Sequence, residues 1–343
     1  MVSLYVLLVL YFVAAGADFI SPHDPNHRDL DHPFSPPQLI RWSFGHGLYT
    51  HPLVLHVDPI TFRRTYVEQR HVAVPLRFAV PSDPYHLWGL IPISHRLIGI
   101  DRDAFVAPSG DTAARLFLLG TDKFGRDVFS RAVHGARVSL SVGLIGIGIM
   151  FVLGILIGGV SGYAGGATDN LIQRGIEVLN AFPHLPLWIA LAAAVPDDWP
   201  PLAVYFFITI VLSLLGWTGL ARVVRGKILS LREEGYAQAA RAIGAGHGRI
   251  LFRHLMPGFT SHIVVSLTLS VPGMILGETS LSFLGLGLRP PIVSWGVMLQ
   301  DCMDVQAVRY YPWLMAPVGL IIVTVLCFNF FGDGLRDAAD PYA

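Results

Sequence analysis

Six stretches of the chain are apolar over about 20 residues, which is the length that a helix needs to cross the roughly 30 Å hydrocarbon core of a bilayer. These stretches are Val2–Ile20, Val138–Tyr163, Leu171–Val195, Leu202–Ala221, Ile263–Leu286 and Trp313–Phe331. They predict an all-α integral membrane protein with six transmembrane helices. The second stretch carries Gly154 and Gly158, whose spacing favours close helix packing, although glycine is also common in membrane helices generally.

The composition supports a membrane protein and excludes several soluble classes. Only 14% of the 343 residues are charged and 53% are hydrophobic, whereas soluble domains carry about 25% charged residues. The 24 basic and 24 acidic side chains cancel and leave no basic face for a nucleic acid. Cys302 and Cys327 fit neither a disulfide framework nor a zinc ligand set.

Arginine and lysine in the short loops indicate which side of the membrane each loop faces. The loop between the fourth and fifth stretches is the most basic, with Arg222, Arg225, Lys227, Arg232, Arg241, Arg249 and Arg253. The loops on the opposite side, residues 196–201 and 287–312, hold only Arg289 and Arg309. The basic loop and the C-terminal tail are therefore predicted to be cytoplasmic.

This orientation divides the chain into four parts. Residues 1–20 form an N-terminal transmembrane anchor and residues 21–137 an extracytoplasmic insert with the approach to the second helix. Residues 138–332 form a core of five transmembrane helices with a cytoplasmic loop at 222–259, and residues 333–343 form a cytoplasmic tail. Ala15-Gly16-Ala17 resembles a signal-peptidase site, so cleavage of the anchor is the alternative to its retention.

The outer segment differs in character from the rest of the chain. Prolines recur between residues 21 and 119, and short runs such as Thr65–Val80 predict a small irregular β-containing module. A metal site is one interpretation of the pairs His23 and His27, and His51 and His56, because imidazole is a common metal ligand. No cysteine or tight His-x-His pattern accompanies them, so scattered surface histidines are the expectation.

The basic cytoplasmic loop carries the pattern of an amphipathic helix. Tyr236, Ala239, Ala240 and Ile243 fall at helical spacing, and Glu233 and Glu234 precede them where a helix N-terminus favours negative charge. Gly244-Ala245-Gly246 is predicted to end this helix. A second short helix is expected to begin at Ile250–Leu255 and to stop at Pro257. The stripe fits a groove on another protein, lipid headgroups or the chain's own bundle.

The loop sequence YAQAARAIGAGHGRILFRHLMPG, residues 236–258, resembles the coupling-loop signature of importer-type ABC permeases. Ala239, Ala240, Gly244 and Pro257 match that signature at the right spacing. Gln238, His254 and Met256 depart from it. These departures, together with Ala245 after the glycine, are similar to the form found in the dipeptide, oligopeptide and nickel branch of the family.

Further segments carry the same resemblance in the same order. GTDKFGRDVFSRAVHGARVSLSVG, residues 120–143, looks like the start of the second transmembrane helix in that branch. Residues 275–299 and 328–341 are similar to the end of the fifth helix and the C-terminal tail of the second permease subunit. The outer insert is longer than the family's usual loop, and no role carries over to it.

The resemblance implies the type I ABC importer permease fold and a set of partners. A second permease subunit would pair with this chain, two ATP-binding subunits would receive the coupling loop, and an extracytoplasmic solute-binding protein would deliver the substrate. The chain itself lacks a phosphate-binding loop, because Gly226-Lys227 is followed by Ile228 and preceded by Ala221 where a glycine is required. ATP and magnesium are therefore expected on the partner subunits, with no catalytic residue and no cofactor here.

The candidate functional residues fall into three groups. The ATPase-coupling group is Tyr236, Gln238, Ala239, Ala240, Gly244, Ala245, His254 and Pro257. Glu278 is a carboxylate inside a predicted span, which indicates a gating, structural or path-lining role. Asp122, Arg126, Asp127 and Arg131 precede the second helix, where they could pair with each other, seat the binding protein or remain solvated. Arg174 and Glu177 are expected to form a local pair.

The sequence thus predicts a permease for di- or oligopeptides in a bacterial or archaeal cytoplasmic membrane, working by alternating access. A nickel or metal-chelate importer is the alternative within transport. A membrane-anchored receptor without an ATPase partner is a rival of another class. A membrane protease is disfavoured because the chain has no HExxH or GxSxG motif and no second intramembrane acid paired with Glu278.

Overall fold

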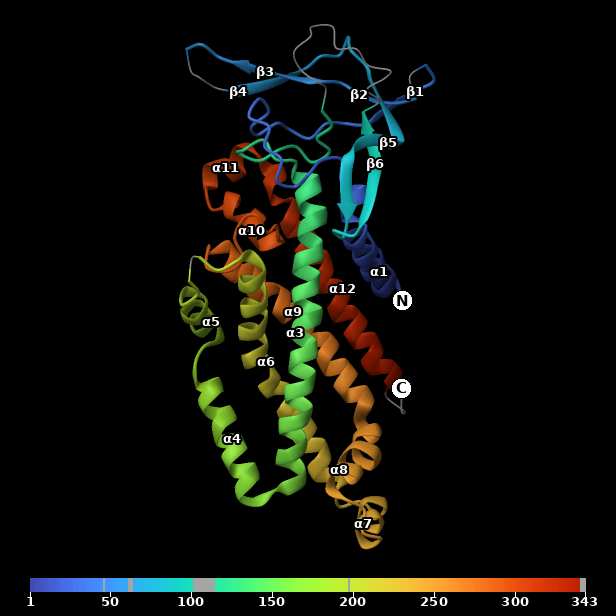
Figure 1. Ribbon diagram of the computed structural model, residues 1–343, viewed down its shortest axis with the longest axis vertical. Helices are drawn as coiled ribbons and strands as arrows, with labels where there is room; N and C mark the ends of the chain where they lie inside the picture. The colour runs from blue at the N-terminus through green and yellow to red at the C-terminus, as the bar shows by residue number, and fades with distance from the viewer. Residues whose placement is uncertain (46, 61–63, 101–114, 197, 340–343) are drawn as a thin grey trace. The chain divides into compact units, whose positions relative to one another are not determined.

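The computed structural model describes residues 1–45, 47–60, 64–100, 115–196 and 198–339. The chain divides into two compact units. We call the first the helical unit, which comprises Met1–Leu8, Ser139–Leu288 and Ile321–Ala343, and the second the strand-containing unit, which comprises Val9–Val138 and Arg289–Leu320. Figure 1 labels their elements along the chain. Residues 340–343 of the predicted tail lie outside the described residues.

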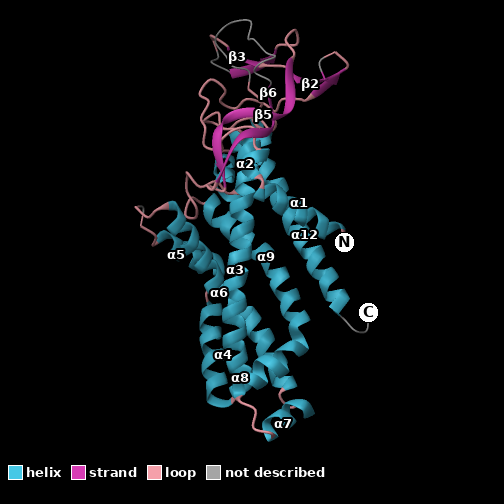
Figure 2. Ribbon diagram, turned by 45° about the vertical axis from the view of Figure 1, so that its right-hand side comes forward, coloured by secondary structure: helices cyan, strands magenta, loops and turns pink. Residues whose placement is uncertain are grey.

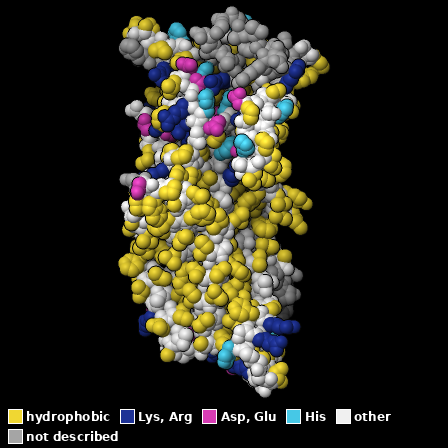
Figure 3. Space-filling model, viewed as in Figure 1, with side chains coloured by type: hydrophobic (Ala, Val, Ile, Leu, Met, Phe, Trp, Pro, Cys, Tyr) yellow, Lys and Arg dark blue, Asp and Glu magenta, His cyan; other side chains and the backbone are white. Residues whose placement is uncertain are grey.

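The helical unit is built from long apolar helices. Its elements are the membrane part of α3 (Val128–Ala164), α4 (Gly166–Ala181), α5 (His184–Ala193), α6 (Pro201–Leu231), α7 (Gly235–Ala242), α8 (His247–Arg249), the π-helical turn η1 (Ile250–Leu255), the 3-10 turn η2 (Met256–Phe259), α9 (Thr260–Phe283) and the end of α12 (Ala316–Ala339). Hydrophobic side chains cover the middle of the face shown in Figure 3, and Lys, Arg and His side chains gather at the α7 end of this unit.

Among the described residues, four helices are long and apolar enough to cross a bilayer, at Val128–Ala164, Pro201–Leu231, His247–Phe283 and Pro312–Ala338. α4 and α5 would form a fifth span if taken together, but they meet at a bend of 82°. The bend falls at Phe182 and Pro183, because a residue before proline is forced into extended backbone and proline donates no hydrogen bond. α1 (Val2–Ala15), with 14 residues, is shorter than a span.

Pro257 does not stop a helix, contrary to the sequence prediction. The chain continues from α8 through η1 and η2 into α9 as one helical stretch. Pro257 occupies the first turn of η2, where its missing N–H has no required acceptor and its fixed φ suits a helical backbone. The helix therefore extends well before the apolar stretch, since hydropathy reports the lipid-embedded part of a helix and not its ends.

Close packing of α3 on α6 is confirmed for the glycine-rich face. An added Cβ on Gly158 would lie 2.4 Å from the Ala221 carbonyl oxygen, and one on Gly154 would lie 2.7 Å from a Leu220 methyl carbon. Gly162 continues the same face, with 2.8 Å to the Arg225 carbonyl oxygen. Only glycine permits this approach of two backbones, as in other closely packed membrane helices.

The strand-containing unit confirms the expectation of β-structure in the outer segment (Figure 2). Its strands are β1 (Arg41–Ser43), β2 (Gly47–Thr50), β3 (Leu53–Val57), β4 (Arg64–Glu68), β5 (Val74–Leu87) and β6 (Ile91–Ile100). Four of them form an antiparallel sheet in the order β1-β2-β5-β6, and β3 pairs with β4. The short helix α2 (Ala17–Ile20) follows α1 within this unit.

The strand-containing unit also contains a small apolar core. Short helices follow residue 289, namely α10 (Trp295–Leu299), η3 (Gln300–Cys302), α11 (Val305–Tyr310) and η4 (Pro312–Met315). Their buried side chains Met298, Ala307 and Leu314 pack with Val128 and Ala132 from the first turns of α3. The Trp295 indole N–H donates to the Ala132 carbonyl over 3.0 Å. The start of α3 is thereby held within this unit.

Candidate functional site

The cytoplasmic loop predicted from the sequence folds into α7, a two-turn helix with a defined start and end. The Glu234 carbonyl accepts the first helical bonds, from the backbone N–H of Ala237 and of Gln238. The Gln238 side-chain amide donates to the Glu233 carbonyl over 2.9 Å, a bond that the ionised glutamate of the generic signature could not donate. At the other end, Gly244 adopts φ +80°, the left-handed conformation that commonly ends helices.

The stripe predicted on this helix is split between two environments. Ala237 and Ala240 are buried, whereas Tyr236, Ala239 and Ile243 are exposed. Ala240 therefore packs on the chain's own helices, one of the alternatives left open for the stripe, and Ala237, three residues before it, is buried with it. The exposed edge includes Ile243, which is 85% exposed.

The buried edge of α7 rests on a core drawn from several helices. This core, which we call the coupling core, contains Ile155, Leu220, Val224, Ile228, Ala237, Ala240, Ile250, Leu251, Leu255, Phe259 and Ile263. Its members come from α3, α6, α7, η1, η2 and α9. The buried edge of α7 thus packs against the ends of all three long helices.

Polar contacts hold α7 and α8 against the end of α3. The Arg241 guanidinium lies 5.3 Å from the ring centre of Tyr163, and the Tyr163 hydroxyl lies 3.0 Å from Nδ1 of His247. Arg232 donates from Nη1 to the Gly162 carbonyl over 3.1 Å. Three basic side chains of the cytoplasmic loop are thus engaged with α3. Of the remaining signature residues, His254 is half-buried and Pro257 is exposed.

A bidentate ion pair joins α4 to α6 beside the coupling core. The Arg225 guanidinium donates from Nε and from Nη2 to the two carboxylate oxygens of Asp169, each over 2.6 Å. The Ser161 hydroxyl donates to the same carboxylate. Asp169 is buried, and planar two-point pairing of this kind is the strongest geometry for an arginine and a carboxylate.

Replacing Arg225 with methionine is expected to lower the free energy of unfolding by about 1–3 kcal/mol, because a buried carboxylate loses two charge-assisted hydrogen bonds. Thermal denaturation of the purified protein in mild detergent measures the loss. The control is Arg174→Met. Arg174 pairs with Glu177 over 2.9 Å, as predicted, but both side chains are exposed, so the cost is about 0–1 kcal/mol. Equal losses would contradict a special role for the Arg225 pair.

Glu278 is fully buried in α9 and is held by hydroxyl groups. It accepts from Ser139 Oγ over 3.3 Å and from Ser282 Oγ over 2.8 Å. Ser282 Oγ in turn accepts from the backbone N–H of Leu288 over 3.0 Å. The carboxylate therefore links α9 to α3 and to the turn that follows α9, all within the helical unit.

The charged group at the start of α3 is buried, so the solvated alternative is wrong. Asp122, Arg126, Asp127 and Arg131 are each no more than 6% exposed. Arg126 donates from Nε to Asp122 over 2.6 Å, and Arg131 lies 3.7 Å from the same carboxylate. The two arginines thus pair with Asp122 and not with Asp127. The exposed neighbour that sequence reasoning missed is Lys123, which pairs with Asp301 over 2.9 Å.

Asp127 has a structural task at the start of α3. Its carboxylate accepts from the backbone N–H of Ser130 over 3.0 Å and also from the Ser130 hydroxyl, as an N-terminal helix cap does. Burial raises the pKa of the Asp127 carboxyl. The neighbouring His23 places Nε2 2.9 Å from the Leu116 carbonyl. Within the described ranges, no three His, Cys, Asp or Glu side chains converge as a metal site.

Comparisons with known proteins identify the family of this chain. The family described as the binding-protein-dependent transport system inner membrane component matches residues 151–342, which include α7 and Glu278. The chain belongs to this family of transport permeases. The N-terminal transmembrane domain of oligopeptide transport permease C matches residues 1–37. Residues 38–150 of this permease, which carry the strands, lie outside both matches.

Several curated relatives of this permease share about two fifths of the aligned residues. The chain is 41% identical over 223 residues to the oligopeptide transport system permease protein OppC of Bacillus subtilis (strain 168), covering 65% of this chain and 70% of the relative. It is 42% identical over 222 residues to the dipeptide transport system permease protein DppC of the same organism, covering 65% and 68%. The family resemblance stated from the sequence motifs is confirmed.

Two further proteins are similar to this chain. The oligopeptide transport system permease protein OppC of Haemophilus influenzae is 39% identical over 242 residues, covering 70% of this chain and 75% of the relative. Among solved structures, inward-facing MetNI, a methionine ABC transporter, is 16% identical with a TM-score of 0.47, covering 62% of this chain and 98% of that one.

Proposed function

We propose that this chain is the transmembrane permease subunit of an ATP-driven importer for di- and oligopeptides. The observation that carries the proposal is the 39–42% identity to permeases named for oligopeptide and dipeptide transport. These names favour peptides over nickel or a metal chelate. In this account the fold is that of a type I ABC importer permease, in which α1, the broken pair α4–α5 and the four long helices together make six spans.

The proposed complex contains three further kinds of protein around this chain. A second permease subunit would complete the substrate path across a bacterial or archaeal cytoplasmic membrane, and an extracytoplasmic binding protein would deliver the peptide. Two ATP-binding subunits would hold ATP and magnesium, because this chain has no phosphate-binding loop. The chain would then be a non-catalytic subunit, with no resident cofactor.

The two edges of α7 give the coupling its geometry. The exposed edge, Tyr236, Ala239 and Ile243, would sit in a groove of the ATP-binding subunit as an amphipathic helix does. The buried edge, Ala237 and Ala240, rests on the coupling core. When ATP closes the partner subunits, α7 would move with them and tilt α3, α6 and α9 against the rest of the path. ATP shifts the equilibrium only by as much as these contacts differ between the two states.

Glu278 fits a gating role in this cycle. Its hydrogen bonds to Ser139 and Ser282 tie α9 to α3, and buried carboxylate bonds break only at a substantial cost unless another donor replaces them. A change of partner at Glu278 would therefore give the bundle two discrete arrangements. On the extracytoplasmic side, the buried cluster around Asp122 would stabilise the loop that carries Lys123. This loop would form part of the surface that contacts the binding protein.

Affinity purification of the tagged full chain from mild detergent, with mass spectrometry of the co-purifying proteins, tests the proposed assembly. We expect one related permease, ATP-binding subunits and, when it is present in excess, a solute-binding protein. A matched preparation of an established importer shows that the detergent keeps such complexes intact. Recovery of this chain alone under those conditions would favour a membrane-anchored receptor and contradict the importer.

A further inference from the structure

The β5–β6 hairpin ends in an apolar tip that the family match does not cover. Twelve consecutive residues, 84–95, contain no Asp, Glu, Lys or Arg. Their centre, Leu87–Ile91, forms the turn between the two strands, with Leu87 opposite Ile91. Trp88 is 56% exposed and Leu90 is 77% exposed, and Ile91 beside them is exposed as well. Three large apolar side chains thus stand together at the end of an otherwise narrow hairpin.

The backbone of this tip is held in an uncommon conformation. Trp88 has φ +54° and Gly89 has φ +71°. A positive φ is ordinary for glycine but rare and costly for a bulky side chain, so the surroundings of Trp88 must compensate. They do so through a hydrogen bond, since the Trp88 indole N–H donates to the Ala15 carbonyl over 2.8 Å.

That bond fixes the tip at the end of the apolar helix α1. The last carbonyls of a helix have no partner inside it, and in a membrane protein they must be satisfied where hydrocarbon gives way to polar groups. Here Arg137 donates from Nε to Ala14 and from Nη2 to Ala15, each over 3.1 Å. Trp88 supplies a second donor to the Ala15 carbonyl. The end of α1 is therefore capped by one arginine and one tryptophan.

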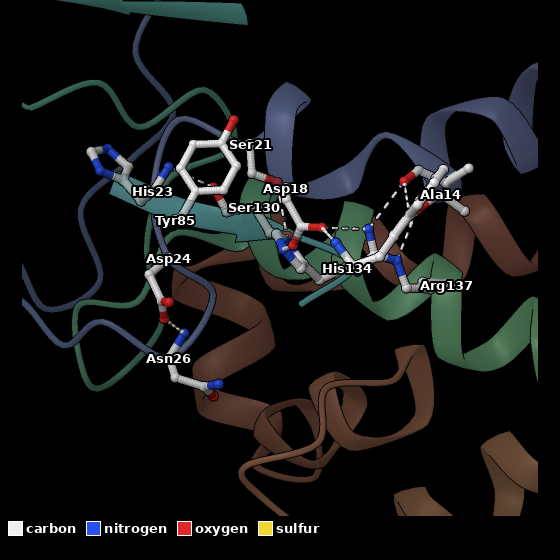
Figure 4. A network of polar contacts seen from close by, with 12 residues as sticks. Ala14, Asp18, Ser21, His23, Asp24, Asn26, Tyr85, Ser130, His134 and Arg137 are labelled. Atoms are coloured by element: carbon white, nitrogen blue, oxygen red, sulfur yellow. Dashed lines mark hydrogen bonds and ion pairs between the residues drawn. The ribbon is translucent and has the colours of Figure 1, made fainter. Parts of the chain in front are cut away.

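A charged network lies beside the same end of α1, as is typical where a helix leaves the membrane. Asp18, two residues beyond the glycine that ends α1, pairs with Arg137 over 2.9 Å and lies 3.2 Å from Nε2 of His134. Figure 4 shows Asp18 between these two side chains, with Ala14 beside Arg137. The Trp88 backbone N–H also donates to Asp18 over 3.3 Å. The helix preceding this network exposes apolar side chains such as Val9 and Phe12.

We propose that the hairpin tip Leu87–Ile91 inserts into the headgroup and acyl boundary of the outer leaflet beside α1, and that it anchors the strand-containing unit to the lipid surface. Three observations select lipid as the partner. The tip is hydrogen-bonded to the end of α1, a helix that exposes Val9 and Phe12. Residues 1–37 match a transmembrane domain, and an indole with its N–H bonded and its ring exposed is typical of the membrane interface. Insertion of the tip would involve the bilayer alone and would not depend on which solute the permease carries.

Spin-label accessibility in lipid vesicles tests the insertion. The full chain, purified with its partner subunits and with both native cysteines replaced by alanine, would carry one label at Leu90→Cys or Ile91→Cys. The vesicles are phosphatidylethanolamine with phosphatidylglycerol. We expect collisions with oxygen to exceed collisions with a water-soluble nickel chelate at both sites, because oxygen concentrates in hydrocarbon. The matched control is Phe44→Cys, an exposed aromatic position in the turn after β1.

Phe44 lies at the opposite end of the sheet from the tip, because β2 pairs with residues 74 and 75 at the start of β5. It should therefore show the reverse ratio, with the nickel chelate favoured. Labels at Leu90 and Ile91 that resemble Phe44 would show a water-facing tip and overturn the proposal. Labels that are shielded from both reagents would also overturn it, because they would show that a protein covers the tip.

Discussion

Replacing Gly244 with tryptophan is expected to uncouple ATP hydrolysis from solute uptake. A Cβ at this position meets no atom of the chain beyond its immediate neighbours within 4 Å, so a side chain can begin here without contact inside the permease. The indole would stand beside Ile243 on the exposed edge of α7 and obstruct the groove of the ATP-binding subunit. We expect uptake per ATP hydrolysed to fall roughly tenfold or more, which corresponds to about 1.4 kcal/mol of lost coupling.

The control for this change separates obstruction from backbone strain. Gly244 has φ +80°, and any side chain there carries a strain that asparagine tolerates best. Gly244→Asn should therefore retain most of the uptake. The measurement compares ATP hydrolysis with solute uptake by the reconstituted complex for both variants. Full coupling in the tryptophan variant would remove α7 from the mechanism, and equal failure of both variants would assign the effect to strain.

Replacing Gly158 with leucine is expected to prevent α3 and α6 from packing. The added Cβ alone would lie 2.4 Å from the Ala221 carbonyl oxygen and 2.8 Å from its Cα, and these are backbone atoms that cannot move aside. The helices would have to separate along the whole Gly154, Gly158 and Gly162 face. We expect a loss of about 3 kcal/mol or more in stability, seen as an aggregated fraction on gel filtration in detergent.

The same substitution at Gly148 provides the comparison. Gly148 lies in the same helix, is exposed, and an added Cβ there meets nothing within 4 Å. Gly148→Leu should elute as the wild-type protein does, because lipid or detergent accommodates a leucine as readily as a glycine. If Gly158→Leu is as well behaved as Gly148→Leu, then the two helices do not pack through this face.

The sequence predicted the positions of the long helices because a helix that crosses hydrocarbon needs a long apolar run, and such a run is visible directly in the sequence. Helix ends beyond the bilayer obey a different rule. α3 begins at Val128 and not at Val138, since its first turns pack on α10, η3 and η4 of the strand-containing unit. The broken third stretch likewise follows from a local feature, Pro183, that mean hydropathy does not register.

The location of α7 was predictable from the sequence, but which of its residues are buried and which are exposed was not. Alanines are small enough to suit either a core or a partner, so Ala237, Ala239 and Ala240 look alike in the sequence. Their burial is decided by the coupling core, whose members are distant along the chain. The charged group at the start of α3 shows the same limit, because Asp301, whose carboxylate lies 3.7 Å from Nη2 of Arg126, is distant along the chain.

ATP-driven uptake of a labelled dipeptide into proteoliposomes tests the central claim most directly. The vesicles would contain the complex co-purified through this chain, with ATP inside and the binding protein with peptide outside. Our account predicts accumulation that requires ATP, that unlabelled peptides reduce by competition and that nickel salts leave unchanged. Accumulation of nickel in place of peptide, or no ATP-dependent uptake of any peptide by an intact complex, would contradict it.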